Sequence, residues 1–193
     1  MNRVCVFCGS SPGLGDDYLA LARSLGETLA QRGIELVYGG AAVGLMGATA
    51  DACLGAGGRV IGVIPEYLAD KELAHPGLTQ LEVVDSMHAR KARMADLSDA
   101  FVALPGGVGT LEELFEIWTW TQLGLHRKPL GVVNAGGFYQ GLIDFVAHLA
   151  DQGFMKPAHR DLLLADSSPA GLLDRLATAD LPDTPKWVAT PRR

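Results

Sequence analysis

One stretch of sequence decides the fold: residues 100–113, which read AFVALPGGVGTLEE. The apolar run Ala100–Leu104 has the length and composition of a buried strand. Three glycines follow within five residues, and a segment with helical periodicity, Leu111–Leu123, comes after them. A strand that passes through a glycine-rich loop into a helix is the repeating unit of α/β proteins. The stretch therefore predicts a strand whose carboxyl end opens on a tight loop.

The same alternation of apolar runs and helical segments continues along most of the chain. Leu19, Ala22, Leu25 and Leu29, for example, have the spacing of one face of a helix. The expected strands are Arg3–Phe7, Glu35–Tyr38, Arg59–Ile64, Leu81–Val84, Ala100–Leu104 and Leu130–Asn134. The expected helices are Asp16–Arg32, Leu45–Ala56, Met87–Ser98, Leu111–Leu123, Phe138–Gln152 and Pro169–Ala179.

Such alternation predicts an α/β fold of the Rossmann-like, doubly wound type, with a mostly parallel sheet and helices on both faces. A chain of 193 residues is long enough for one domain. We expect that domain to span residues 1–180. Residues 181–193 contain three prolines and little periodicity, and they are expected to form a loose tail. Ligands of such folds bind at the carboxyl ends of the strands, beside the point where the strand order reverses.

Composition excludes several classes of function. The 16 Lys and Arg against 22 Asp and Glu give a net charge of −6, whereas a nucleic-acid-binding domain is typically basic. No apolar run approaches the ~18 residues of a membrane span. The first apolar run, Val4–Cys8, is shorter than the hydrophobic part of a signal peptide. We therefore expect a cytoplasmic protein that binds neither nucleic acid nor a membrane.

The three cysteines are expected to be buried apolar residues. Cys5 and Cys8 match the C-x-x-C spacing of redox proteins. A redox pair, however, needs a helix N-terminus to lower its thiol pKa, and Cys5 lies within a strand-like run. Residues three apart on a strand face opposite sides of the sheet. Three cysteines, Cys53 included, also cannot form a four-cysteine zinc site.

Glycine is the compositional outlier, with 24 residues. Many of them group directly after predicted strands, in the loops Gly9–Gly15, Gly39–Gly47 and Gly106–Gly109. Backbone N–H groups at a helix start, with no side chain in the way, form an anion site. The last two loops run into helices and therefore predict a phosphate-binding surface. None of the loops matches the G-x-G-x-x-G or P-loop patterns.

Two features of the sequence allow both a structural and a functional interpretation. Thr110 and Glu113 have the spacing of a capping box, which stabilises a helix N-terminus by about 1 kcal/mol. The segment 86–93 opens a helix with several cations, although cations there oppose the helix dipole. It forms either a solvated basic face or part of a functional site, where local rules are often broken.

The glycine loop and the basic segment together resemble a known family. Residues 105–113 match PGGxGTxxE and residues 87–91 resemble MxxRK, the two signatures of the LOG (LONELY GUY) family. These proteins, often labelled lysine decarboxylase-like, are cytokinin riboside 5′-monophosphate phosphoribohydrolases. The loops Val4–Ser11 and Gly39–Gly47 are also similar, so the resemblance covers residues 2–180.

The resemblance implies hydrolysis of the N-glycosidic bond of a nucleoside 5′-monophosphate, AMP-type substrates included, to free base and ribose 5-phosphate. It implies that Arg90 and Glu113 are the catalytic pair, that no metal or cofactor is needed, and that the protein is a homodimer. Ser10 and Gly40 would lie close to the site. The implied substrate contacts are Glu72, Arg90, Lys91, Gly106, Gly107, Val108, Gly109, Thr110, Leu111, Glu112, Glu113 and Thr119.

Two other functions stay open at this level. Rossmann-like relatives carry ligands such as the molybdenum cofactor without catalysis, but a carrier does not require both Arg90 and Glu113. A decarboxylase would require pyridoxal phosphate on a lysine, and no lysine here lies in a recognisable cofactor motif. No motif identifies the preferred base.

Overall fold

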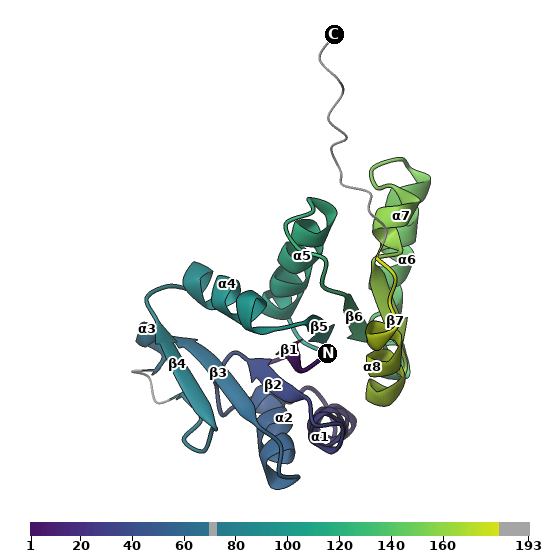
Figure 1. Cartoon of the computed structure of the whole chain (residues 1–193). Helices are drawn as coiled ribbons and strands as arrows, with labels where there is room; N and C mark the ends of the chain where they lie inside the picture. Colours follow the sequence, from purple (N-terminus) through teal and green to yellow (C-terminus); the bar gives the residue numbers. More distant parts are fainter. Residues whose placement is uncertain (70–72, 182–193) are drawn as a thin grey trace.

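The computed structural model describes residues 1–69 and 73–181. Seven described strands form one parallel sheet in the order β4-β3-β2-β1-β5-β6-β7 (Figure 1). The strands are β1 (Arg3–Phe7), β2 (Glu35–Tyr38), β3 (Val60–Pro65), β4 (Gln80–Val84), β5 (Ala100–Ala103), β6 (Leu130–Val133) and β7 (Leu163–Asp166). The helices are α1 (Asp17–Gln31), α2 (Gly44–Gly55), α3 (Glu66–Leu68), α4 (Met87–Leu97), α5 (Val108–Gln122), α6 (Gln140–Asp151), α7 (Pro157–Arg160) and α8 (Pro169–Ala177). The predicted doubly wound α/β fold is confirmed.

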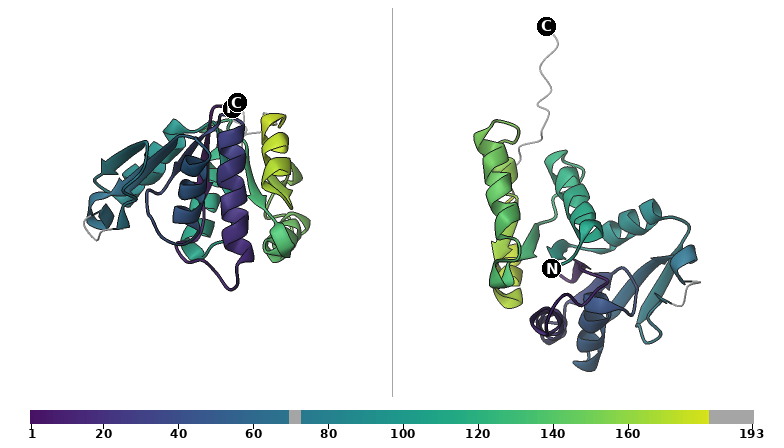
Figure 2. Two further views of the ribbon diagram at one scale, coloured as in Figure 1. Left: turned by 90° about the horizontal axis from the view of Figure 1, so that it is seen from below. Right: turned by 180° about the vertical axis from the view of Figure 1, so that it is seen from behind.

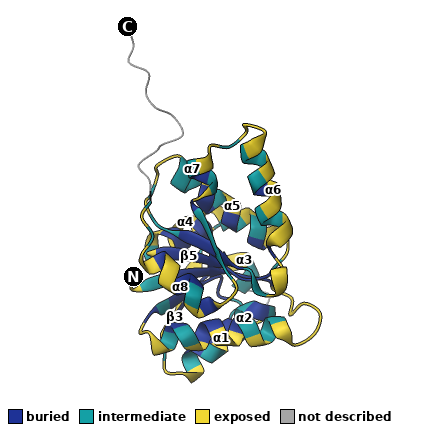
Figure 3. Cartoon of the chain, turned by 90° about the vertical axis from the view of Figure 1, so that its right-hand side faces the viewer, coloured by how far each residue is buried: buried dark blue, intermediate teal, exposed yellow. Residues whose placement is uncertain are grey.

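Helices cover both faces of the sheet, as the alternation predicts. On one face α1, α2 and α8 pack against strand side chains such as Val4, Val6 and Leu36. On the other face α4, α5 and α6 pack against Phe7 and Phe101. Figures 1 and 2 show α4 and α5 on the opposite side of the sheet from α1 and α2. The five inner strands are almost entirely buried, whereas the edge strands β4 and β7 are partly exposed, as are the outer faces of the helices (Figure 3).

The strand order reverses between β1 and β5. From β1 the chain builds the sheet outward through β2, β3 and β4, then returns to the other side of β1 to begin β5. At the carboxyl ends of this central pair, the amide N–H of Gly9 donates to the carbonyl of Pro105 at 3.1 Å. The two loops that leave β1 and β5 therefore meet at the switch point, which is where such folds bind ligands.

The structure contains elements that the sequence did not predict. β7 and the short helices α3 and α7 are absent from the sequence-based set. β7 is rich in leucine, which does not favour a strand by itself, and it is fixed by its pairing with β6. The predicted tail, 181–193, lies outside the described residues except for Leu181.

The cysteines are free and buried, as predicted. Cys5 belongs to the core on the α5 side of the sheet, and Cys8 belongs to the core on the α1 side. Burial raises the pKa of the Cys8 thiol far above its ordinary value, so it stays protonated. No helix within the described residues is long and apolar enough to span a membrane.

Candidate active site

A cavity of about 370 Å³ opens at the switch point. This volume lies in the range of small-molecule sites, which is about 300–1,000 Å³. Its walls come from the loops after β1 and β5 and from the first turns of α2, α4 and α5. The lining residues are Cys8, Gly9, Ser10, Met46, Met87, Arg90, Gly107, Val108, Gly109, Thr110, Glu112 and Glu113.

Arg90 is the cation of this cavity and lies in the first turn of α4. That helix begins where the sequence predicts, because the Ser86 hydroxyl accepts from the Ala89 amide and caps it. The Arg90 side chain is about 10% exposed, and its Nε donates to the Val63 carbonyl at 3.1 Å. A second contact joins Nη1 to the Met87 sulfur at 3.2 Å. The guanidinium is therefore held in one place while part of it still faces the cavity.

Glu113, on α5, faces Arg90 across the cavity. Its Oε1 lies 3.7 Å from Arg90 Nη1, and its side chain is 14% exposed. Burial raises the pKa of the Glu113 carboxyl above its ordinary value, although the nearby Arg90 guanidinium acts in the opposite direction. A carboxylate with a raised pKa beside a fixed guanidinium in a cavity is typical of a functional site.

The capping-box interpretation of Glu113 is wrong. α5 begins at Val108 rather than at Leu111, with Gly107 as its N-cap and no side-chain capping bond. Thr110 is therefore inside the helix and cannot cap it. Glycine has no side chain, so the first amides of α5 lie against the cavity without obstruction. The Glu113 carboxylate is thus free of the capping role that its spacing suggests.

The solvated-face interpretation of the basic segment is also wrong. Arg90 and Lys91 are both buried, at 8% and 7% exposure. Lys91 does not line the cavity within the described residues. Its Nζ lies 2.5 Å from Glu112 Oε1 and 2.8 Å from Glu116 Oε2. The two basic residues thus have different partners on α5: Arg90 faces Glu113 in the cavity, whereas Lys91 pairs with Glu112 and Glu116.

The glycine loop before α2 packs closely against the β1 loop and Arg90. The Leu45 amide, in the first turn of α2, donates to the Gly9 carbonyl at 3.0 Å. Gly44, with φ of +57°, lies against the backbone of Ser10. A side chain on Gly39 would occupy the position of the Arg90 guanidinium. These glycines therefore bring the β1 loop and Arg90 into place, and a ligand need not touch them.

The remaining predicted residues are placed unevenly around the cavity. Ser10 lines it, and Gly40 lies next to Gly39 with its carbonyl bound to the His75 amide at 2.9 Å. Leu111 packs into the core, whereas Thr119 is exposed further along α5 and does not line the cavity. Gly106 lies at the wall of a neighbouring cavity. Glu72 lies outside the described residues.

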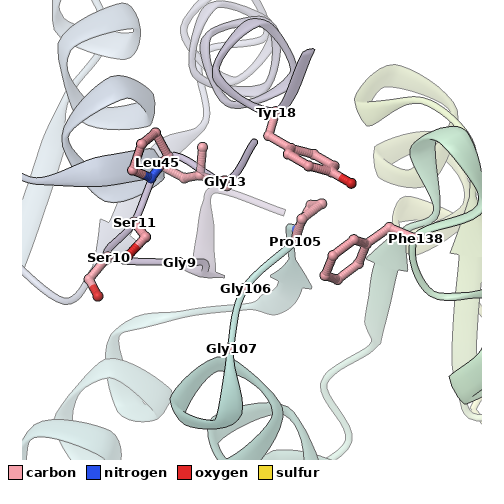
Figure 4. A pocket seen from close by; sticks show the side chains of 11 residues that line it. Gly9, Ser10, Ser11, Gly13, Tyr18, Leu45, Pro105, Gly106, Gly107 and Phe138 are labelled. Carbon is pink, nitrogen blue, oxygen red and sulfur yellow. The ribbon is translucent and has the colours of Figure 1, made fainter. Parts of the chain in front are cut away.

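The neighbouring cavity, of about 310 Å³, shares Gly9, Ser10 and Gly107 with the first. Tyr18 and Phe138 face each other across it, with their ring centroids 5.7 Å apart (Figure 4). Apart from the phenol of Tyr18, its lining has no ionisable side chain. The acid–base and electrostatic groups therefore converge on the first cavity.

Sequence reasoning did not single out Met46 or Met87 as lining residues, and it assigned Gly39 to an anion-binding loop rather than to the space beside Arg90. The two methionines line the cavity, and Gly39 makes room for Arg90. Met87 belongs to the MxxRK segment, so its spacing from Arg90 was a usable signal. Together these groups leave an apolar wall around one cation, one carboxylate and a row of backbone amides. Such a cavity can hold a phosphorylated ligand and stabilise positive charge on it.

Residues 46–176 match the family model described as "Possible lysine decarboxylase". The chain belongs to this family, the LOG family. Two of its LOG-family relatives carry the name cytokinin riboside 5′-monophosphate phosphoribohydrolase. One, from Rhodococcoides fascians, is 53% identical over 84% of this chain and 83% of its own length. The other, from Arabidopsis thaliana, is 45% identical over 91% of this chain and 81% of its own.

Solved structures show how widely the fold of this LOG-family chain is shared. The molybdenum cofactor binding protein of the phototrophic bacterium Rippkaea orientalis superposes with a TM-score of 0.70, over 92% of this chain and 96% of that one. The molybdenum cofactor carrier protein of Chlamydomonas reinhardtii superposes with a TM-score of 0.68, over 91% and 96%. Sequence identities are only 21% and 22%, so these likenesses show the fold alone.

Proposed function

We propose that this chain hydrolyses the N-glycosidic bond of nucleoside 5′-monophosphates, with cytokinin ribosides and AMP-type nucleotides as the substrate class. The observation that carries the proposal is the buried pair of Arg90 and Glu113, which face each other beside the open N-terminus of α5. Relatives that are about half identical and carry the same activity in their names support it.

The 5′-phosphate would bind at the N-terminus of α5. Free amide groups and the positive end of the helix dipole favour an anion there. The hydroxyls of Ser10 and Thr110 line the same cavity and add hydrogen-bond donors. Of the described cationic side chains, Arg90 alone lines the cavity, so it supplies the charge that a phosphorylated sugar needs.

Glu113 would act on the sugar ring rather than on the phosphate. Cleavage of a glycosidic bond passes through an oxocarbenium-like transition state, with positive charge on the ring. A buried carboxylate stabilises that charge more strongly than one in water, because the local dielectric constant is low. The same oxygen atoms can orient the attacking water. Arg90 keeps its proton and holds the ribose or phosphate oxygens by its forked donors.

The reaction balances without a further reactant. The bond between C1′ of the ribose and the nitrogen of the base breaks, and the bonding electrons leave with the base. Water adds its oxygen to C1′, and a proton from that water ends on the base. The products are the free base and ribose 5-phosphate. The pKa of Glu113 is raised, so the carboxylate form, and with it the activity, declines at a higher pH than an ordinary glutamate would dictate.

The alternative functions receive less support from this site. A decarboxylase would require a lysine that could form a Schiff base in the cavity, and no described lysine lines it. A non-catalytic carrier would be indifferent to the loss of Glu113, since binding of a phosphate there needs amides and cations.

We extend the proposal to the assembly and the compartment of the protein. Phe115, on α5, and Phe145, on α6, are 38% and 57% exposed, and a second copy would cover them. Thr119, exposed on α5, would then contact the substrate near the interface of a homodimer. Three buried free thiols suit the reducing cytoplasm. Light scattering coupled to gel filtration measures the mass, and a monomer at micromolar concentration would contradict the dimer.

The direct experiment is to incubate the purified protein with AMP and with N6-isopentenyl-AMP and to measure free base by chromatography. We expect base from at least one of them. Arg90→Ala should lose at least about 100-fold in kcat/KM. Arg93→Ala is the matched control, since Arg93 lies on the same helix but pairs with Glu82 outside the cavity. A folded wild-type protein that releases no base from either nucleotide refutes the proposal.

A further inference from the structure

Lys91 follows Arg90 directly on α4, yet its ammonium group is turned to α5 and not to the cavity. Its Nζ donates to Glu112 Oε1 at 2.5 Å and lies 2.8 Å from Glu116 Oε2, with which it forms an ion pair. The side chain is only 7% exposed. A lysine in this position is a charge confined between two helices.

The charges around Lys91 are unfavourable for a phosphate. One ammonium and two carboxylates leave a net charge of −1, and an incoming anion would meet both carboxylates. Burial lowers the pKa of Lys91, but the hydrogen bonds to Glu112 and Glu116 more than compensate and raise it overall. The lysine therefore stays charged at physiological pH.

Three ion pairs join α4 to α5: Arg90 pairs with Glu113, and Lys91 pairs with Glu112 and Glu116. Arg90 and Glu113 are separated by 3.7 Å, which is longer than a hydrogen bond, while the neighbouring Lys91 contact is 2.5 Å. The short contact joins the two helices, and the longer separation of Arg90 and Glu113 leaves both groups able to accept a ligand.

We infer that Lys91 is a positioning residue and not a substrate ligand: it ties α4 to α5 and thereby sets the separation of Arg90 and Glu113. The expected effect on kcat rests on the proposed hydrolysis. The link that Lys91 forms between α4 and α5, called the tie below, is a property of the fold and does not depend on that proposal. Glu116 does not line the cavity, yet by holding Lys91 it would contribute to the activity of the site.

Kinetics distinguish this role from direct binding of the phosphate. Lys91→Met should lower kcat by about 10- to 100-fold, because a misplacement of about 1 Å can cost 10²-fold. The Kd of ribose 5-phosphate and of inorganic phosphate, measured by calorimetry, should change by less than about 3-fold. A charged hydrogen bond to phosphate would instead make its loss cost roughly 10- to 150-fold in Kd. Lys91→Arg, which can reach the same carboxylates, should restore most of kcat.

The carboxylates provide the second arm of the experiment. Glu116→Gln should lower kcat without weakening phosphate binding, and in a Lys91→Met background it should lower kcat no further. Lys128→Met is the matched control: Lys128 also holds α4, through the Ala95 carbonyl at 2.7 Å, but lies away from the cavity. It should reduce the melting temperature and leave kcat unchanged.

Three results from binding and kinetics would overturn the inference: weaker phosphate binding in Lys91→Met, full kcat in that variant, or a kcat for Glu116→Gln equal to wild type. Melting temperatures provide a second test, which does not depend on enzymatic activity. Melting temperatures of the single and double variants should show that Lys91 and Glu116 are coupled, and additive effects would refute the tie. If the wild type releases no base, the proposed function fails, and the tie is decided by this thermal cycle alone.

Discussion

Gly39 offers the sharpest test of whether the position of Arg90 governs the activity. It is buried at the end of β2, and its φ is not in the left-handed region, so an alanine can adopt the same backbone. The added methyl group, however, would lie 1.7 Å from Arg90 Nη2 and 2.9 Å from Cζ. The requirement for glycine at this position is therefore steric: it comes from the arginine and from the flexible end of Met46, whose methyl carbon would lie 2.5 Å away.

The size of the effect follows from these distances. Ordinary van der Waals contact begins at 3.4 Å, so Nη2 must retreat by roughly 1.7 Å from the new methyl group. Arg90 cannot do this and keep both its bond to the Val63 carbonyl and its place opposite Glu113. A misplacement of about 1 Å can cost 10²-fold in rate. Gly39→Ala should therefore lower kcat/KM by about 100-fold or more.

The assay is base release from the better nucleotide, measured together with thermal unfolding. Gly55→Ala is the matched control, because Gly55 is exposed on α2 with open space around it. That variant should keep full activity and be as stable as wild type or more so, since alanine favours a helix. In an Arg90→Ala background, Gly39→Ala should cost little more. A Gly39→Ala protein with more than half of wild-type kcat/KM, or a full additional loss in the double variant, would refute the reasoning.

Four further expectations concern stability. The pKa of Glu113 is raised in the folded protein, so its negative charge destabilises the fold at any pH above the pKa of the unfolded state. Glu113→Gln should therefore raise the melting temperature at pH 7, and this gain should vanish near pH 3. Glu82, whose pKa an arginine lowers, should behave oppositely: Glu82→Gln should lower the melting temperature at pH 7, with the loss fading as the pH falls through the folded pKa. Ser86→Ala removes the cap of α4 and should cost about 1 kcal/mol in urea unfolding. Tyr139→Phe leaves the buried Leu104 carbonyl without its 2.6 Å donor and should cost about 1–3 kcal/mol, measured in the same way.

The sequence was sufficient to predict the fold, because the features that specify its strands and helices are local. Buried parallel strands appear as short apolar runs, and caps such as Ser86 mark where helices begin. β7 was not predicted, because its leucines adopt a strand conformation only through pairing with β6. The start of α5 was misplaced by three residues because Gly107 caps the helix without a side chain, and so leaves no signature.

Part of the site could be predicted from the sequence, for a different reason. Arg90 and Glu113 occur in motifs, so their identities were available before their geometry. The direction in which each side chain points was not. Lys91 is adjacent to Arg90 in sequence, yet successive helix positions face directions about 100° apart, and it pairs with α5. The role of Gly39 depends on a contact between residues 51 positions apart, which no local pattern encodes.

The most direct measurement of the central claim is turnover by Glu113→Gln with nucleotide still bound. Glutamine keeps the shape of the side chain and removes its charge. We expect AMP to bind with a Kd within about 10-fold of wild type, while release of free base falls by at least about 10²–10⁴-fold, the contribution usual for such a group. A Glu113→Gln protein that binds AMP and releases base at nearly the wild-type rate would contradict the assignment of the reaction to this carboxylate.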